Sequence, residues 1–234
     1  MDDKKNKKEG TQSDTLLAYL GQFVTAHKRA VIARVLNQRT EHITMVLEDI
    51  YQSQNASAVL RTCECYGLQR VHIIENENTY SLNRRVLKGA EKWIDIVQYN
   101  RAGEHNTAAC FEQLKSQGYQ VLATVPAEQA QPITAVDVNQ KVALVMGNEL
   151  HGLSDYALQQ AHAQVKIPMY GFTESLNLSV SAAICIHELI GKLKASSIAW
   201  GLSEARKRDI ELRWFKKLIR NSDVLEKHFL ESIT

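Results

Sequence analysis

The chain contains 234 residues, of which 44% are hydrophobic and 23% are charged, and its formal net charge is +2. This length suits one domain with extensions, or at most two small domains, and the hydrophobic content supports an ordinary buried core. The near-zero net charge singles out no class of partner, and no apolar stretch approaches the roughly 18 residues that a membrane span needs.

Four cysteines are spread along the chain, and only Cys63 and Cys65 lie close together. Their C-x-C spacing differs from the C-x-x-C of common metal and redox sites, so all four are expected to be thiols of a reduced, cytoplasmic protein. The eight histidines show no metal-ligand spacing, and no metal site is expected. The N-terminal MDDKKNKKEG lacks the apolar core of a signal peptide, which also favours a cytoplasmic location.

The N-terminal region divides into a polar tail and a helical extension. Residues 1–13 are rich in lysine and are expected to form a flexible basic tail. Residues 14–37 carry apolar side chains at helical spacing, which predicts an N-terminal helical extension over residues 14–41.

From residue 42 to about residue 194, short strand patterns alternate with helical patterns. Strands are expected at 43–50, 70–75, 93–99, 119–125, 141–147 and 164–169. Helices are expected at 55–67, 104–117, 154–161 and from the stretch SLNLS (175–179) to about 194, with Asn55 and Ser154 as N-caps. This alternation predicts an α/β domain with a mostly parallel sheet over residues 42–194.

The C-terminal extension, residues 195–234, returns to helical spacing and is dense in basic residues. One interpretation is a solvated helix that packs on the domain. The other is a surface that contacts nucleic-acid phosphates or a partner helix. The basic residues concerned are Arg206, Lys207, Arg208, Arg213, Lys216, Lys217 and Arg220.

The segment MGNELHGLS follows a nearly continuous apolar strand and has part of a phosphate-loop pattern. Gly147 and Gly152 have the required glycine spacing, but Leu153 stands where the phosphate-binding lysine is needed. No G-x-G-x-x-G is present, so neither nucleotide hydrolysis nor a dinucleotide-binding fold is indicated. The two glycines suit tight turns or a close approach to a flat ligand, and a plain connection from strand to helix is the structural alternative.

Two further segments combine ordinary helix signals with residues suited to chemistry. In NASAVLR, Asn55 can serve as a helix cap alone, whereas Arg61 can form a surface salt bridge or hold a phosphate or a developing oxyanion. In ESLNLSVSAAICIHEL, Ser175, Asn177 and Ser179 offer more hydrogen-bonding groups than one N-cap needs.

Together, these segments resemble the motifs of the SpoU/TrmH branch of the SPOUT RNA methyltransferases. Asn55 followed by Arg61 matches the first motif, and the pattern G-x-E-x-x-G-L-S from Gly147 matches the second. The third motif, IPM-x-G and then SLN-x-S-x-A, is matched by residues 167–171 and 175–182. The flanking helical extensions match the layout of the tRNA-modifying group within this family.

The resemblance implies a SPOUT fold with a deep trefoil knot at the C-terminal end of the sheet and an obligate homodimer packed around the knot. S-adenosylmethionine is the implied cofactor, held in the knotted loops largely by backbone groups. By their positions in the motifs, the residues implied to line its pocket are Thr124, Gly147, Ile167, Met169 and Leu176.

The implied reaction transfers a methyl group to a ribose 2′-hydroxyl of RNA, with guanosine 18 of the tRNA D-loop as the first expectation. The implied catalytic residues are Asn55, Arg61, Glu149, Ser175 and Asn177. Because a guanidinium stays protonated, Arg61 is expected to bind the adjacent phosphate and stabilise the incipient alkoxide. Ser175 and Asn177 are expected to serve the loop geometry, the substrate ribose or the partner subunit's Arg61.

A tRNA substrate gives the basic residues a function as an RNA-holding surface, whose affinity should fall steeply with salt. This surface is expected to comprise Arg29, Arg34, Arg39, Arg84, Arg85, Lys88 and the basic residues of the C-terminal extension. Two alternatives remain open from the sequence. One is 2′-O-methylation of rRNA or of another tRNA site, and the other is a non-catalytic RNA-binding dimer that has kept the fold.

Overall fold

The computed structural model of the chain describes residues 14–232, so the expected N-terminal tail, residues 1–13, lies outside the described residues. Contacts divide the chain into two compact units. The larger unit is Thr40–Trp200, and the smaller unit combines the segments before and after it in the sequence. The sequence patterns had placed the limits of the larger unit at 42 and 194.

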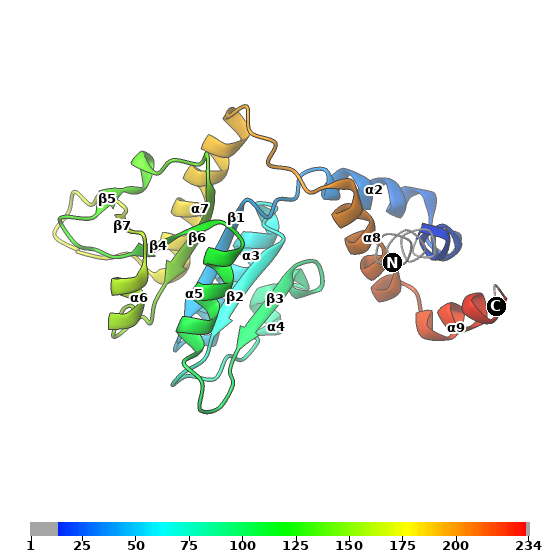
Figure 1. Cartoon of the computed structure of the whole chain (residues 1–234), viewed down its shortest axis with the longest axis horizontal. Coiled ribbons are helices and arrows are strands. Elements are labelled where there is room, and N and C mark those ends of the chain that lie inside the picture. The colour runs from blue at the N-terminus through cyan, green and yellow to red at the C-terminus, as the bar shows by residue number, and fades with distance from the viewer. Residues whose placement is uncertain (1–13, 233–234) are drawn as a thin grey trace. The chain divides into compact units, whose positions relative to one another are not determined.

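A seven-stranded sheet forms the centre of the larger unit, and every neighbouring pair of its strands is parallel (Figure 1). The spatial order of the strands is β3-β2-β1-β6-β4-β7-β5. Their bounds are β1 Ile43–Glu48, β2 Arg70–Ile74, β3 Asp95–Tyr99, β4 Tyr119–Thr124, β5 Gln131–Pro132, β6 Lys141–Met146 and β7 Ala163–Lys166. The expected α/β fold with a largely parallel sheet is therefore confirmed.

Helices cover both faces of this sheet and make a three-layer unit. One face packs against α3 (Ser53–Cys65), α4 (Arg84–Leu87) and α7 (Leu178–Ala195), and the other packs against α5 (Asn106–Ser116) and α6 (Asp155–Gln160). Successive side chains of a strand point to opposite faces, so Met45 and Leu47 of β1 enter the first core while Val46 enters the second. The central strand β6 is buried from Val142 to Met146, as its apolar run indicated.

Local signals placed most helix boundaries within a few residues of those observed. Ser154 caps α6 as expected, because its side chain accepts a hydrogen bond from the N–H of Ala157. The expectation that Asn55 caps α3 is wrong, since α3 begins at Ser53, has Gln52 as its N-cap residue and contains Asn55 in its first turn. The elements that sequence patterning missed are short: β5, α4 and the 3₁₀ turns Ala90–Lys92 and Ile133–Ala135. They contain too few residues to produce a periodic pattern.

The sheet order brings four loops of the chain to one edge. Strand β6 lies between β1 and β4, and β7 follows β4, so the carboxyl ends of these four strands are neighbours. The chain places β2 and β3 on one side of β1, and it places β6, β4 and β7 on the other side, so the strand order reverses between β1 and β6. Such a reversal of strand order leaves a crevice in which open α/β sheets bind ligands.

Helices make up most of the described part of the smaller unit. It contains a helical segment over residues 14–21, α2 (Ala26–Leu36), α8 (Glu204–Leu218) and α9 (Ser222–Ser232). Its buried side chains include Leu20, Leu36 and Trp214. The helical spacing of residues 14–37 is interrupted before Thr25, whose side chain caps α2 by accepting from the N–H of Lys28 over 3.3 Å.

Within residues 14–232, no helix combines the length and the apolar character that a membrane crossing requires.

Candidate functional site

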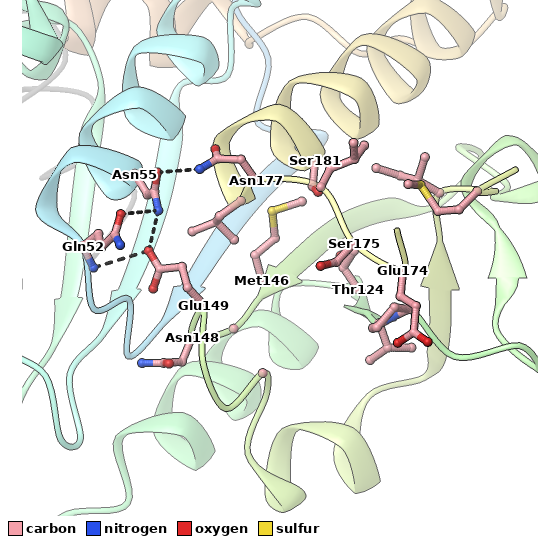
Figure 2. A pocket seen from close by; sticks show the side chains of 18 residues that line it. Gln52, Asn55, Thr124, Met146, Asn148, Glu149, Glu174, Ser175, Asn177 and Ser181 are labelled. Carbon is pink, nitrogen blue, oxygen red and sulfur yellow. Dashed lines mark hydrogen bonds between the residues drawn. The ribbon is translucent and has the colours of Figure 1, made fainter. Parts of the chain in front are cut away.

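A pocket of about 560 Å³ opens at the carboxyl ends of β4 and β6, and the first turn of α3 contributes to its wall (Figure 2). Loops that follow β4, β6 and β7 supply the rest of the lining. The expected site residues that line it are Asn55, Thr124, Gly147, Glu149, Ile167, Met169, Ser175, Leu176 and Asn177. The fold therefore brings all three sequence motifs to one cavity of a size that suits a small ligand.

A chain of hydrogen bonds joins the three motifs at one wall of this pocket (Figure 2). Asn55 Nδ2 donates to Glu149 Oε1 over 2.8 Å, and Asn177 Nδ2 donates to Asn55 Oδ1 over 3.2 Å. Asn177 Oδ1 in turn accepts from the backbone N–H of Ser179 over 2.9 Å and caps α7. Each of the three motif residues is thus bonded to another motif, and Asn177 is bonded to a helix terminus as well.

The carboxylate of Glu149 sets the direction of the bonds in this chain. A carboxylate accepts hydrogen bonds and donates none, so Asn55 must present its Nδ2 to Glu149. The Oδ1 of Asn55 then faces Asn177, and because this oxygen only accepts, Asn177 must present its own Nδ2. The Oδ1 of Asn177 is left for the N-terminus of α7. One acidic side chain therefore orients two amides that lie on different helix starts.

Glu149 also supplies the capping group that α3 lacks. The side chain of Gln52, at the N-cap position, makes no capping hydrogen bond. Instead, Glu149 Oε2 accepts from the N–H of Tyr51 over 2.9 Å, and Glu149 Oε1 accepts from the N–H of Gln52 over 3.3 Å. A negative charge near the first N–H groups of a helix also interacts favourably with the helix dipole. These contacts favour a positioning role for Glu149 over direct proton transfer.

Gly147 occupies a position with no room for a side chain. A Cβ there would lie 2.4 Å from the carbonyl carbon and oxygen of Gly152 and 2.5 Å from the nitrogen of Leu153. These atoms belong to the backbone, which cannot swing aside as the end of a long side chain can. Asn148 and Gly152 close the turn with two backbone hydrogen bonds of 2.9 Å each. The second motif therefore needs glycine because the two arms of its loop touch.

Among the polar side chains of the lining, those of Thr124, Glu174 and Ser175 have no hydrogen-bond partner among the described residues. The hydroxyl of Thr124 is buried at the end of β4, whereas the side chains of Glu174 and Ser175 are exposed on the loop before α7. Leaving a buried hydroxyl unsatisfied costs about 1–3 kcal/mol, so Thr124 is a group that a bound ligand can satisfy. Figure 2 shows these three residues on the opposite side of the pocket from Asn55 and Glu149.

Two buried thiols lie on the helices behind the pocket, Cys63 on α3 and Cys185 on α7. Burial raises the pKa of Cys185 to about 12 and also raises the pKa of Cys63. A thiol with a raised pKa stays protonated near neutral pH and is a poor nucleophile. These cysteines therefore belong to the core, and covalent catalysis by a thiol is not indicated.

Arg61 is the expected catalytic residue that the fold does not bring into the pocket lining of its own chain. Arg61 lies six positions after Asn55, and at 3.6 residues per turn the two residues lie on different faces of α3. The side chain is exposed, and its Nη1 lies 3.5 Å from the carbonyl oxygen of Val86, at the limit of a hydrogen bond.

A short basic segment adjoins Arg61. Helix α4 carries Arg84 and Arg85, which are both exposed, and Asn83 caps it by accepting from the N–H of Arg85 over 3.2 Å. Lys88 follows with a φ of 53°, in the left-handed region that residues with a Cβ seldom occupy. The expected RNA-binding residues of the larger unit are therefore exposed and lie on one segment.

The expected RNA-binding residues of helix α8 are largely engaged in ion pairs within the smaller unit. These pairs are Arg206–Asp209, Arg213–Asp209, Arg208–Asp14 and Lys216–Glu226, with distances from 2.6 to 3.4 Å. Arg29, Arg34 and Lys217 are exposed. Partly exposed ion pairs contribute about 0–1 kcal/mol, so a nucleic-acid phosphate can compete with the acidic partner.

Arg39 does not lie on the surface. It is 1% exposed, and its guanidinium carbon lies 5.4 Å from the centre of the Trp214 ring. The expectation that Arg39 contributes to an RNA-holding surface is therefore wrong, because this cation packs over an aromatic ring inside the smaller unit.

Sequence reasoning missed the contribution of several residues at the pocket. Gln52, Asn148 and Glu174 line it, and Asp49 holds the loop that carries Glu149. The available signal was proximity, since Asn148 and Glu174 stand beside motif residues and Asp49 is the last but one residue of the first expected strand. Within the described part of the chain, no group of three or more His, Cys, Asp or Glu side chains could hold a metal ion.

Comparison with known proteins agrees with this arrangement of motifs. Residues 42–187 match the sequence model of the SpoU rRNA Methylase family. The tRNA (guanosine(18)-2′-O)-methyltransferase of Borreliella burgdorferi is 41% identical over 210 residues, which cover 90% of this chain and 94% of that protein. The protein of the same name from Thermus thermophilus is 33% identical over 164 residues, which cover 70% and 82% respectively.

Among solved structures, an A. aeolicus TrmH/SpoU tRNA modifying enzyme has a similar fold, with a TM-score of 0.72. The two chains are 26% identical, and the alignment covers 82% of this chain and 96% of that chain. The similarity in both comparisons thus extends past residues 42–187 into the flanking helical segments.

Proposed function

The chain belongs to the SpoU rRNA Methylase family, and from this membership we propose that it transfers a methyl group from S-adenosylmethionine to the 2′-hydroxyl of guanosine 18 in the tRNA D-loop. The observation that carries the proposal is the hydrogen-bond chain Glu149–Asn55–Asn177, which unites the three family motifs at one pocket. The relative from B. burgdorferi, matched over nearly its whole length, favours a tRNA guanosine as the substrate.

The pocket fits S-adenosylmethionine, which when bound supplies a methyl group already activated on a sulfonium sulfur. Thr124 offers a buried hydroxyl without a protein partner, and the turn at Gly147 presents backbone to the cavity. Ile167, Met169 and Leu176 offer apolar surface for a flat aromatic ring. These features are the ones that a nucleoside ligand with polar edges and an apolar face requires.

The charge of the lining also suits this cofactor. Its charged side chains are Glu149 and Glu174, so the pocket contains two carboxylates and no cationic side chain. Glu149 is engaged with α3, whereas Glu174 makes no hydrogen bond to a described residue. Glu174 would therefore face a positively charged part of the cofactor.

Arg61 would act on the RNA through charge. A guanidinium remains protonated and cannot serve as a base, but its planar donors suit a phosphate and stabilise negative charge on the attacking oxygen. The proton of the 2′-hydroxyl would then leave to a phosphate oxygen or to water. Ser175, exposed at the pocket, would orient the ribose. The enzyme's main contribution is alignment, because the methyl donor needs no further activation.

A homodimer would complete this site, since Arg61 lies outside the pocket of its own chain. The loop before α7 and the start of that helix expose large apolar side chains that a single chain leaves in solvent. They are Met169 (38% exposed), Tyr170 (96%), Phe172 (109%), Leu176 (37%), Val180 (45%) and Ile184 (38%). A group of exposed apolar side chains on one segment is typical of protein interfaces. A second copy of the chain would cover it and bring the partner subunit's Arg61 to the pocket.

The basic residues would hold the tRNA by its phosphates. Arg84, Arg85 and Lys88 would act beside Arg61, and the exposed cations of the smaller unit, such as Arg34 and Lys217, would contact further phosphates. Affinity should then fall steeply as salt rises, because each phosphate contact releases counterions.

Two further properties of the family are proposed for this chain. The loops after β6 and β7 would form the trefoil knot. The protein would act in the cytoplasm, a location consistent with its four free thiols and with a tRNA substrate.

Incubation with unmodified tRNA and labelled S-adenosylmethionine, followed by nucleoside analysis, tests the proposed function. Label is expected in 2′-O-methylguanosine and should disappear when guanosine 18 is replaced by adenosine. Label that survives this replacement, or that enters rRNA alone, would support another RNA target. Absence of label with RNA still bound would support a non-catalytic binding protein. Arg61→Ala should abolish transfer and leave cofactor binding intact, while Arg61→Lys keeps the charge and should retain part of the activity.

A further inference from the structure

Asp49, the first residue after β1, stands where three loops of the larger unit meet. Its φ is 51°, in the left-handed region that asparagine and aspartate enter more readily than other residues with a Cβ. Its carboxylate Oδ1 accepts from the backbone N–H groups of Asn76, Glu77 and Asn78 over 2.7, 2.9 and 3.2 Å. The loop that follows β2 is thereby wrapped around this one side chain.

The backbone carbonyl of Asp49 is also used, and it points to the second motif. It accepts from Asn148 Nδ2 over 2.7 Å and from Asn78 Nδ2 over 3.1 Å. Asn148 lies in the loop after β6, 99 positions away in the sequence. The unusual backbone conformation at Asp49 therefore serves two contacts that an extended strand end would not make together.

Asn148 shapes the turn that carries Glu149. Its Oδ1 accepts from the N–H of Leu150 over 2.8 Å and from the N–H of His151 over 3.2 Å, and the residue is buried. Because this oxygen is held by two donors, the Nδ2 of Asn148 must point to the carbonyl of Asp49. One amide thus both forms the turn and anchors it to the end of β1.

The two loops hold each other at consecutive residues. Asn148 donates to Asp49, and the neighbouring Glu149 accepts from the N–H groups of Tyr51 and Gln52, which follow Asp49 in the chain. Two contacts of opposite direction between the same pair of loops fix both their separation and their rotation.

We propose that Asp49 and Asn148 are positioning residues for the methyl transfer, a role that rests on the proposed function of the pocket. They hold the loop of Gly147 and Glu149 in the shape that binds the cofactor and orients Asn55. Neither needs to touch a reacting atom. Because Asp49 also holds residues 76–78, the same residue supports the chain that leads to the basic helix α4.

Four variants separate this role from general stability. Asn148→Asp keeps an acceptor for the N–H groups of Leu150 and His151 but removes the donor to Asp49. Asn148→Ala removes both. Asp49→Gly keeps the left-handed backbone and removes the carboxylate, whereas Asp49→Asn keeps the backbone preference and an acceptor oxygen. Asp49→Asn is therefore the conservative variant that should retain function.

The matched control is Asn106→Ala. Asn106 is a buried amide, 5% exposed, that accepts from the N–H of Arg101 and donates to the carbonyls of Glu75 and Arg101. It therefore makes contacts of the same kind as Asn148 but does not line the pocket. Its replacement should lower stability by a comparable amount and leave the affinity for S-adenosylmethionine unchanged.

Calorimetry measures the dissociation constant of S-adenosylmethionine, and steady-state kinetics give the KM of both substrates. Hydrogen exchange of the amides of residues 150–152 reports on the stability of the turn. Because Asp49→Gly keeps the carbonyl that accepts from Asn148, it should change cofactor binding less than the Asn148 variants do. Asn148→Asp and Asn148→Ala should weaken cofactor binding by on the order of tenfold, raise its KM more than the KM of the tRNA, and speed this exchange. Wild-type binding in these variants, or weakening no greater than in Asn106→Ala, would overturn the proposal. A wild-type protein that binds no cofactor would instead refute the proposed function, while amide exchange would still decide whether Asp49 holds the loop.

Discussion

Asn177 donates a hydrogen bond from its Nδ2 to the Oδ1 of Asn55 over 3.2 Å, although 122 positions separate the two residues in the sequence. The contact joins the start of α7 to the first turn of α3, and Glu149 extends it to the loop after β6. Since each bond in this chain has one permitted direction, a change from amide to carboxylate at either asparagine should be more informative than truncation.

Asn55→Asp should destabilise the larger unit more than Asn55→Ala does. The new carboxylate would stand within hydrogen-bonding distance of Glu149 and could not donate to it, so two negative charges would face each other in a buried place. The expected loss is about 2–4 kcal/mol in the free energy of unfolding. Urea denaturation at pH 7 and pH 5 measures it, and the deficit of Asn55→Asp should shrink at the lower pH. A pH-independent deficit would contradict the assigned directions.

Asn177→Asp should damage catalysis more than folding. The aspartate keeps an oxygen that caps α7 through the N–H of Ser179 but loses the donor to Asn55. Stability should therefore stay within about 1 kcal/mol of the wild type, since aspartate and asparagine are comparable N-caps. The rate of methyl transfer should fall by about 10- to 100-fold, because the two motifs lose their alignment. A wild-type rate in Asn177→Asp, with the loss of stability confined to Asn177→Ala, would show that the residue acts only as a cap.

Gly147→Ala should abolish cofactor binding, because its Cβ would overlap backbone atoms of Gly152 and Leu153. Gly191→Ala is the matched control, since Gly191 lies on α7 and a Cβ there would meet no atom within 4 Å. That change should raise the free energy of unfolding by about 0.5–1 kcal/mol, as alanine is the better helix former. Thermal unfolding and calorimetry of cofactor binding distinguish the two, and normal binding by Gly147→Ala would contradict the assigned geometry.

Glu174→Gln should weaken the binding of S-adenosylmethionine by about 3- to 10-fold and should leave stability unchanged, because no described residue depends on the Glu174 carboxylate. Glu112→Gln removes another exposed acid, which lies on α5 and does not line the pocket, and this variant should bind the cofactor as the wild type does. Calorimetry at low and moderate salt provides the comparison. If both variants bind alike, Glu174 has no direct electrostatic role.

Acid should destabilise the larger unit partly through His72. Its Nδ1 lies 3.0 Å from the hydroxyl of Tyr99, and burial, with the nearby charge of Arg70, lowers the pKa of His72 to about 4. An unfolded histidine has a pKa of about 6.5, so between these values the unfolded state binds more protons. Stability is therefore fully present above pH 6.5 and falls as pH decreases toward 4, by at most about 3 kcal/mol. His72→Gln cannot titrate and should show a smaller loss of stability between pH 7 and pH 5 in denaturant titrations.

The sequence by itself determined the elements whose signals are local. The apolar run KVALVM was enough for a buried central strand, and the hydroxyl of Ser154 was recognisable as a helix cap. The three motifs were also readable, and residues from all of them line one pocket. Periodicity and capping involve residues a few positions apart, so they can be recognised in the sequence without knowing the tertiary contacts.

Only the tertiary structure decided which polar groups meet. In the fold, Glu149 accepts from the N–H of Gln52 at the N-cap of α3, and Asn55 lies inside the first turn of that helix. Arg61 does not line the pocket of its own chain. The tertiary structure also buried Arg39 over Trp214 and made Asp49 the residue on which loops from β1, β2 and β6 converge. A hydrogen bond depends on distances of about 3 Å between groups that can stand 100 positions apart, and the order of strands in the sheet sets those distances.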